Sequence, residues 1–385
     1  MCSAMVYRNQ AIIDSGQPAT HVVLVGVGNY PYLNEGDGDH RTAEHGEMGQ
    51  LSSPPVSAYA IADWFLDKFN NPAKPLASIS LLVSGKGIQP YQNAKLDAPV
   101  MPVAATYPNL KAAVEEWYLL CDGSEENLAM FWFCGHGVAR GLEGLSLLLE
   151  DYGASKITPM DGAVDFAMFR RGMNRCAAKQ QCFFIDACRE VSEVVLNTSA
   201  DGQVLVQDST NRLYASDRDF RVYYAAIEGA AAYGRKNNTS HFTEELIRGL
   251  NGYGSHNMLG NDKWWVSTGR LQEWLHWGLK KRPGKPKVPA GELQGAFEFH
   301  LLSETPMTPV YVGCDPNKDN DAATLSCKTD GHVIATRDPA PKEWLVVVPS
   351  CADYDFEATD GARRAEEKRC YATPPYINVP LRMKP

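Results

Sequence analysis

The sequence lacks the features that mark membrane, secreted and nucleic-acid-binding proteins. Its 385 residues contain no uninterrupted apolar run of about 18 residues, the length that a membrane-spanning helix needs. The first residues hold no apolar core of the kind found in signal peptides, so we expect no secretory signal and a cytoplasmic location. A formal net charge of −9 leaves no excess of basic side chains for a phosphate backbone. We therefore expect neither a membrane nor a nucleic acid as partner.

Paired cysteines are also missing. The ten cysteines are scattered, and no two of them form a Cys-x-x-Cys pair. In a chain without an export signal, cysteines are expected to be reduced rather than bound in disulfides. The four in the last eighty residues lack the paired spacing of zinc ligands, so we expect no metal site and no bound cofactor. A reduced cysteine is then open to a catalytic role.

Apolar runs alternate with segments of helical periodicity over residues 20–302. Strands are expected at 21–27, 78–83, 128–133, 145–149, 181–185, 222–226 and 295–302. Helices are expected at 56–69, at 110–117 with Asn109 as the N-terminal cap, and at 166–178, 242–250 and 266–279. This alternation predicts an α/β fold with a mostly parallel central sheet.

The composition changes after residue 305, where short apolar runs typical of strands follow a proline-rich stretch. We predict a large α/β domain at 1–305 and a small β-rich accessory domain at 306–385. Within the first domain, the polar stretch 190–219 has no periodicity and is expected to be a flexible linker between segments 20–189 and 220–302. The accessory domain is expected to bind the substrate or an activating partner.

Two reactive residues each come directly after an expected strand. His136 follows the strand at 128–133, and Cys188 follows the strand at 181–185. The carboxyl ends of parallel strands meet at one edge of a sheet, where ligands gather. An imidazole beside a thiol can take its proton and make a nucleophilic thiolate. The backbone N–H groups of Gly137 and Cys188 are candidates for an oxyanion hole. The alternative is that Cys188 is a buried structural cysteine.

The residues around this pair resemble the caspase-like peptidases, the group of caspases, metacaspases and paracaspases (peptidase C14 type). The matching segments are FWFCGHG at 131–137 and FFIDACRE at 183–190. Cys188 lies 52 residues after His136, close to the roughly 50 residues of the caspase signature. The resemblance covers about residues 20–302. It implies the caspase-like α/β/α sandwich and a cysteine endopeptidase with Cys188 as nucleophile and His136 as its partner.

The resemblance also implies a substrate class. Caspases carry glutamine two residues before the nucleophile, whereas metacaspases and paracaspases specific for arginine or lysine carry aspartate, as this chain does at Asp186. Asp186 would then lie in the S1 pocket, and Glu228 falls in a segment that lines this pocket in relatives. The resemblance thus implies protein or peptide substrates cut after arginine or lysine. Asp186 could instead cap a turn or pair with Arg189, and Glu228 could be an exposed loop residue.

In the resembling families the linker is cut during maturation, and some relatives need calcium. Arg212 and Arg218 are the only basic residues between Glu190 and Asp219, so they are the candidates for self-cleavage. An intact linker, as in relatives that a ligand or partner switches on, is the alternative. Two other functions stay open from the sequence: a catalytically silent scaffold of this fold, and a cysteine-dependent transferase or regulatory partner of a larger assembly.

Overall fold

The computed structural model describes residues 3–42, 48–140, 144–187, 202–208, 218–225, 235–257, 262–282, 291–361, 363–365 and 367–384. The chain divides into two compact units. The first comprises Met1–Ile247 and His276–Phe297, and the second comprises Arg248–Leu275 and Glu298–Pro385. Compactness alone does not show where an independently folding domain ends, so the boundary at residue 305 stays a prediction.

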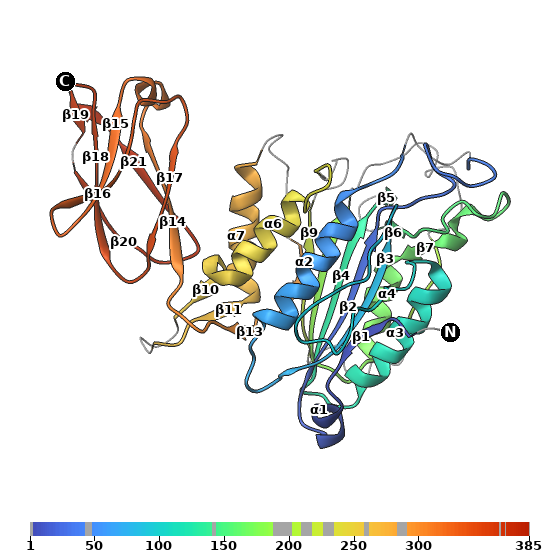
Figure 1. Ribbon diagram of the computed structural model, residues 1–385. Coiled ribbons are helices and arrows are strands. Elements are labelled where there is room, and N and C mark those ends of the chain that lie inside the picture. The colour runs from blue at the N-terminus through green and yellow to red at the C-terminus, as the bar shows by residue number, and fades with distance from the viewer. Residues whose placement is uncertain are drawn as a thin grey trace. The chain divides into compact units, whose positions relative to one another are not determined.

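The first unit is built on a seven-stranded sheet with the order β1-β3-β2-β4-β8-β9-β12 (Figure 1). Its strands are β1 (Met5–Arg8), β2 (Thr20–Val27), β3 (Leu76–Ser84), β4 (Leu128–Gly135), β8 (Gln180–Ala187), β9 (Asp219–Tyr224) and β12 (Glu292–Gln294). The five inner strands run parallel, and β1 and β12 are antiparallel at the two edges. β2 and β4 are buried along their whole length, as central strands covered on both faces are. The predicted mostly parallel α/β sheet is confirmed.

Helices cover both faces of this sheet and make it the middle layer of an α/β/α sandwich. The helices in the described parts of the whole chain are α1 (Gln10–Ser15), α2 (Ser53–Asp67), α3 (Tyr107–Asp122), α4 (Phe166–Gly172), α6 (His241–Arg248) and α7 (Thr268–Lys280). Figure 1 shows α2 and α6 on one face and α3 and α4 on the other. Short 3₁₀ turns, η1 (Pro159–Gly162) and η2 (Met173–Arg175), lie beside α4, and a small antiparallel sheet joins β5 (Gly137–Arg140), β6 (Gly144–Leu148) and β7 (Ala163–Asp165).

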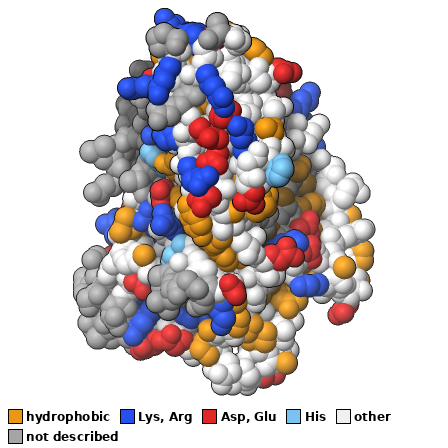
Figure 2. All heavy atoms as spheres, turned by 90° about the vertical axis from the view of Figure 1, so that its left-hand side faces the viewer, with side chains coloured by type: hydrophobic (Ala, Val, Ile, Leu, Met, Phe, Trp, Pro, Cys, Tyr) orange, Lys and Arg blue, Asp and Glu red, His pale blue; other side chains and the backbone are white. Residues whose placement is uncertain are grey.

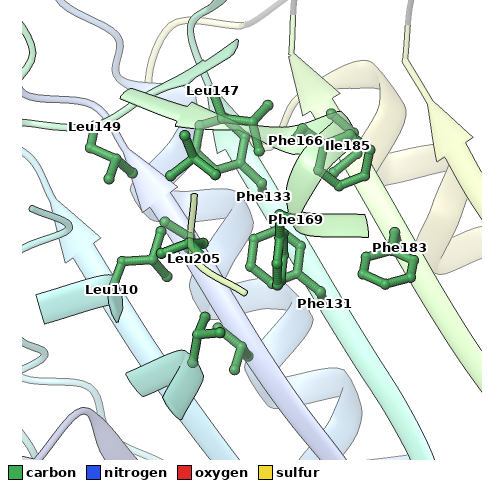
Figure 3. Close-up of a cluster of buried hydrophobic side chains, with 14 of the residues drawn as sticks. Leu110, Phe131, Phe133, Leu147, Leu149, Phe166, Phe169, Phe183, Ile185 and Leu205 are labelled. Atoms are coloured by element: carbon green, nitrogen blue, oxygen red, sulfur yellow. The ribbon is translucent and has the colours of Figure 1, made fainter. Parts of the chain in front are cut away.

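An aromatic cluster fixes α4 on the sheet and sets which side chains point to which face (Figure 3). Phe131 of β4 and Phe169 of α4 meet edge to face, with ring centroids 5.1 Å apart. Phe166 meets Phe183 of β8 in the same way at 5.9 Å. Because side chains alternate along a strand, the residues at even positions of β4 and β8 point to the face covered by α2 and α6. Asp186 is one of them.

The last strand of the large sheet differs from the predicted one. The apolar segment expected at 295–302 forms β13 (Glu298–Leu301), which pairs with β11 (Trp265–Ser267) in a separate sheet together with β10 (Ser255–His256). The large sheet ends instead at β12, a three-residue strand whose Leu293 is exposed. So short a strand with an exposed apolar residue shows no alternation that a sequence pattern could reveal.

The predicted bounds of several helices also differ from the observed ones. α3 begins at Tyr107, so Asn109 is inside its first turn and Thr106 is the cap residue. The carboxylate of Asp151 accepts from the backbone N of Tyr107 at 3.0 Å and does the capping from a distant segment. The first residues of the helix predicted at 266–279 belong to β11, and α7 begins only at Thr268. The helix predicted at 242–250 is α6, which ends at Arg248 and is followed by a π-type turn, η3 (Gly249–Tyr253).

The C-terminal part of the second unit is rich in β-strands, as predicted. One sheet holds β14 (Met307–Cys314), β17 (Trp344–Pro349) and β21 (Ile377–Leu381). The other holds β15 (Thr324–Thr329), β16 (His332–Arg337), β18 (Asp353–Thr359), β19 (Arg364–Ala365), β20 (Lys368–Tyr371) and β22 (Met383–Lys384), and η4 (Asn317–Asp321) follows β14. Val312, Leu325 and Phe356 are among the residues of its apolar core. Cross-strand ion pairs, such as that of Lys328 with Glu357, add charged contacts. Figure 2 shows acidic and basic side chains beside hydrophobic ones on one face of the molecule.

Candidate active site

His136 occupies the turn between β4 and β5, at the carboxyl end of the central strand. Its backbone N donates to the hydroxyl oxygen of Tyr30 at 2.7 Å, and its carbonyl accepts from the backbone N of Leu148 at 3.0 Å. A Cβ atom on Gly135 would lie 2.7 Å from that hydroxyl oxygen, too close for any side chain. The glycine before the histidine is therefore needed so that Tyr30 can reach the turn and fix its backbone.

The imidazole of His136 is held in one orientation. Its Nε2 lies 2.7 Å from the carbonyl oxygen of Gly49, and its ring packs against that of Tyr30 with centroids 4.7 Å apart. Because a carbonyl oxygen only accepts, Nε2 carries the proton, and the neutral ring keeps its lone pair on Nδ1. Burial lowers the pKa of His136 below the ordinary value, and the bond to Gly49 offsets this only in part. The neutral ring can thus serve as a base at Nδ1.

We expect the pKa of His136 to lie below the ordinary histidine value of about 6.5. Burial disfavours the imidazolium in the folded chain, so the unfolded chain binds the proton more readily. The contribution of this group to folding stability is therefore lost as the pH falls below the ordinary value and through the folded pKa. A ¹⁵N-histidine NMR titration of the Cys188→Ala chain, which removes the thiol charge, measures this, and His136→Ala assigns the signal. A midpoint above 6.5 would contradict it.

The two strand ends that carry the predicted dyad are neighbours. Gly135, the last residue of β4, is in register with Ala187, the last residue of β8. His136 follows the first and Cys188 the second, although Cys188 itself lies outside the described residues. Gly137 begins β5 next to His136 and is in register with Leu147. The dyad and the oxyanion hole stay predictions, and the residues that precede His136 and Cys188 in the chain lie on neighbouring strands.

Asp186 is buried at the end of β8, in register with Cys134 of β4, and only 4% of its surface is exposed. Its Oδ2 accepts hydrogen bonds from the hydroxyl groups of Ser240 and Thr243, and the bond from Thr243 measures 3.0 Å. Burial raises the pKa of Asp186, and hydrogen bonds from Ser240, Thr243 and Cys134 lower it in part. A carboxylate thus lies two residues before Cys188 in the chain, supported from α6 and β4. Its role in the S1 pocket stays a prediction.

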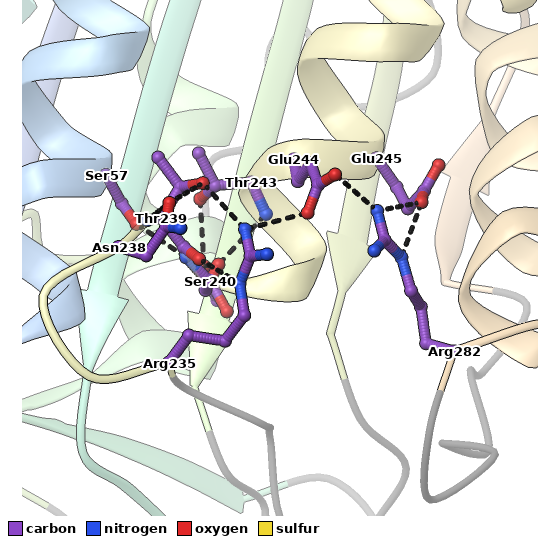
Figure 4. Close-up of polar contacts among 10 residues, drawn as sticks. Ser57, Arg235, Asn238, Thr239, Ser240, Thr243, Glu244, Glu245 and Arg282 are labelled. Carbon is purple, nitrogen blue, oxygen red and sulfur yellow. Dashed lines mark hydrogen bonds and ion pairs between the residues drawn. The ribbon is translucent and has the colours of Figure 1, made fainter.

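The support of Asp186 comes from Ser240 and Thr243 at the N-terminus of α6, and Figure 4 shows these two residues. The hydroxyl of Ser240 accepts from the backbone N of Thr243 at 2.9 Å, which caps the helix, and the backbone N of Ser240 donates to Ser57 of α2 at 3.0 Å. Ion pairs continue the network, because Glu244 of α6 binds Arg235 at 2.7 Å and Arg282 at 2.9 Å. Ser240 was not predicted from the sequence, although a serine just before a helical pattern is an N-cap signal.

Tyr30 and Gly49 were also missed by the sequence analysis. Both lie in or beside the segment between β2 and α2, far from His136 in the chain, and no local pattern connects them to it. The remaining predicted pocket residue, Glu228, lies outside the described residues, as does Arg212.

Arg218 is buried, with 3% of its surface exposed. Its guanidinium donates to the carbonyl oxygens of Ala178 at 2.7 Å, Cys176 at 2.6 Å and Asn174 at 3.0 Å. Self-cleavage after Arg218 stays a prediction, and it would require this side chain to leave its buried site. Residues 202–208 differ from the flexible linker predicted at 190–219. The backbone N of Gln203 donates to the carbonyl oxygen of Ala163 at 2.7 Å, and Leu205 is part of the apolar core.

We expect Arg218→Ala to lower the free energy of unfolding by about 3 kcal/mol, because the charged donor of three buried carbonyl groups is lost. Urea unfolding followed by circular dichroism measures the change. Arg175→Ala is the matched control, since this exposed arginine donates to the carbonyl oxygen of Gln207 and its loss should change stability by less than about 0.5 kcal/mol. Equal stability of the two variants would contradict a structural role for Arg218.

No metal-binding cluster occurs within the described ranges: no three or more His, Cys, Asp or Glu side chains there are arranged to hold an ion. The described helices include none that is long and apolar enough to cross a membrane.

Comparison with known proteins gives a family for the central part of the chain. Residues 73–261 match the family model described as Peptidase_C14, caspase domain. The uncharacterized protein y4kE of Sinorhizobium fredii is 27% identical over 271 residues, which is 64% of this chain and 76% of that protein. Caspase-1 of Spodoptera frugiperda is similar at a TM-score of 0.38 and 10% identity, over 75% of this chain and 88% of that one. A structural-genomics target protein of Geobacter sulfurreducens is similar at a TM-score of 0.41 and 11% identity. The match covers 73% of this chain and 93% of that one.

Proposed function

Because this chain carries a caspase domain of the peptidase C14 family, we propose that it is a cysteine endopeptidase that cleaves proteins after arginine or lysine. The observation that carries the proposal is the placement of His136. Its imidazole is fixed by Gly49 at the end of β4, and the neighbouring strand β8 ends at Ala187, directly before Cys188 in the chain. A base and a thiol attached to adjacent strand ends are what nucleophilic catalysis by cysteine requires.

The reaction follows from these residues. Nδ1 of His136 takes the proton of the Cys188 thiol, and the thiolate attacks the carbonyl carbon of the scissile peptide bond. The backbone N–H groups of Gly137 and Cys188 donate to the oxyanion that forms. The imidazolium gives its proton to the leaving amine as the peptide bond breaks, which leaves a thioester on Cys188. Water, activated by the same imidazole, hydrolyses the thioester and restores the thiol.

The preference for a basic P1 residue is supported by Asp186. Among the described residues, its carboxylate is the buried acidic group nearest in sequence to the nucleophile, and the hydroxyl groups of Ser240 and Thr243 donate to one of its oxygens. A charge-assisted bond to arginine or lysine is stronger than a neutral contact, whereas an acidic P1 residue would place two carboxylates together.

An arginyl chloromethylketone tests the proposal directly, because its arginyl side chain directs alkylation to a nucleophile beside a pocket that binds arginine. We expect stoichiometric labelling of Cys188, found by mass spectrometry of the tryptic peptide, and no such labelling by the aspartyl analogue. The Cys188→Ala chain is the control for labelling of the other nine cysteines. Labelling by neither reagent would favour the second candidate function, a catalytically silent scaffold of the same fold.

Regulation is part of the proposal and rests on the resemblance alone. We propose that an activating partner or the substrate binds the β-rich domain at 306–385, and that the chain processes itself after Arg212 or Arg218. A calcium requirement, as in some relatives, is open to a direct assay with and without a chelator.

A further inference from the structure

Gln50 closes a ring of hydrogen bonds around His136. Its Oε1 accepts from the backbone N of Tyr30 at 2.9 Å, and its Nε2 donates to the carbonyl oxygen of Tyr30 at 2.9 Å. Tyr30 in turn accepts from the backbone N of His136 at 2.7 Å. Gly49, the residue before Gln50, accepts from Nε2 of the same histidine at 2.7 Å. One amide side chain therefore connects the residue that fixes the backbone of His136 to the residue that fixes its ring.

The chemistry of this position suits glutamine. A primary amide can accept from a backbone N–H and donate to a backbone carbonyl at the same time. The Nε2 group of Gln50 also donates to the carbonyl oxygen of Asn34 at 3.0 Å, so three main-chain groups of the segment after β2 depend on it. Tyr30 is equally constrained, since its hydroxyl also reaches the carbonyl oxygen of Leu148 at 3.3 Å and its ring packs on the imidazole.

We propose that Gln50 and Tyr30 are positioning residues that keep the imidazole of His136 bound to Gly49 through Nε2 and ready to accept a proton at Nδ1. Their catalytic importance rests on the proposed peptidase function. Without the amide of Gln50, the segment that carries the Gly49 carbonyl is no longer tied to Tyr30, so the ring samples other orientations. Fewer molecules then present Nδ1 to the thiol, which lowers kcat and leaves substrate binding nearly unchanged.

Two variants and two matched controls test this in the full-length chain. Gln50→Ala removes the amide, and Tyr30→Phe removes only the hydroxyl. Gln89→Ala and Tyr59→Phe are the controls, because Gln89 and Tyr59 line the same cavity of about 770 Å³ as Gln50 but donate to the carbonyl oxygens of Gly87 and Gln89. We expect kcat for an arginyl peptide to fall about tenfold to a hundredfold in the two test variants, with KM changed by less than about twofold.

The orientation of the ring is measured without using activity. In ¹⁵N-histidine-labelled protein near pH 8, the His136 signals of the wild-type chain should show Nε2 protonated, and those of Gln50→Ala and Tyr30→Phe should move toward a mixture of both tautomers. Unchanged ring signals in both variants would overturn the inference, even if kcat fell. If the ring signals shift in the two variants but the wild-type chain hydrolyses no peptide, the positioning role is supported and the proposed function is refuted. If Gln50→Ala does not fold, Tyr30→Phe decides.

Discussion

Replacing Cys188 by alanine is expected to lower peptide hydrolysis by about 10⁴-fold or more, and replacing His136 by alanine to lower it by a similar factor. In the proposed mechanism the two residues act as one unit, because the imidazole generates the thiolate that attacks the substrate. Removing either member therefore removes most of what the pair contributes, and the double variant should be little worse than either single one. Steady-state hydrolysis of an arginyl peptide measures all three variants against the wild-type chain.

The controls separate chemistry from folding. Cys182→Ala removes a buried cysteine of β8 whose pKa burial raises, so its thiol stays protonated, and activity should stay near the wild-type level. Circular dichroism should show the same helix and strand content in every variant. In His136→Ala the thiol of Cys188 should also react more slowly with iodoacetamide at neutral pH, since no base takes its proton. A Cys188→Ala chain that cleaves at the wild-type rate would refute the assignment.

The central strands could be predicted from the sequence because each is an apolar run that the chain buries on both faces. The run at 128–133 became β4, and the run at 181–185 became β8. Placing His136 and Cys188 at neighbouring strand ends followed from the rule that parallel strands share a carboxyl edge, and the register of Gly135 with Ala187 agrees with it.

The contacts that orient the site could not be predicted in the same way. The hydrogen bonds that Tyr30 and Gly49 make with His136 join residues that are 106 and 87 positions apart. Such contacts depend on how a loop returns to the sheet, and no periodicity encodes that path. The edge strands were missed for a related reason: Met5–Arg8 and Glu292–Gln294 are so short that their apolar residues show no pattern.

The second large effect is expected at Asp186. Asp186→Asn keeps the shape of the side chain and removes its charge, so kcat/KM for an arginyl peptide should fall about a hundredfold through loss of a charge-assisted bond. The reaction of Cys188 with iodoacetamide, which needs no S1 pocket, should change by less than about threefold. Asp14→Asn is the matched control, because Asp14 is an exposed carboxylate on α1 that accepts from the amide of Gln10. A positional peptide library read by mass spectrometry gives the P1 profile of each chain.

A purely structural role for Asp186 predicts a different pattern. The carboxylate connects β8 to the cap of α6 through Ser240 and Thr243, so its loss would lower the free energy of unfolding by about 1–3 kcal/mol. In that case arginyl and alanyl peptides would lose activity in the same proportion, and the P1 profile would not change. A profile of the wild-type chain dominated by P1 aspartate would exclude the pocket role outright.

The pH dependence separates the two roles further. Burial raises the pKa of Asp186, so the folded chain binds this proton more tightly than the unfolded chain does. The contribution of the group to stability is thus lost as the pH rises from the ordinary aspartate value through the raised one. Recognition of arginine needs the ionised carboxylate, so the preference for an arginyl over a neutral citrullyl peptide should increase over the same window. If Asp186 is the S1 carboxylate, stability and selectivity therefore change in opposite directions with pH, and Asp186→Asn abolishes both trends.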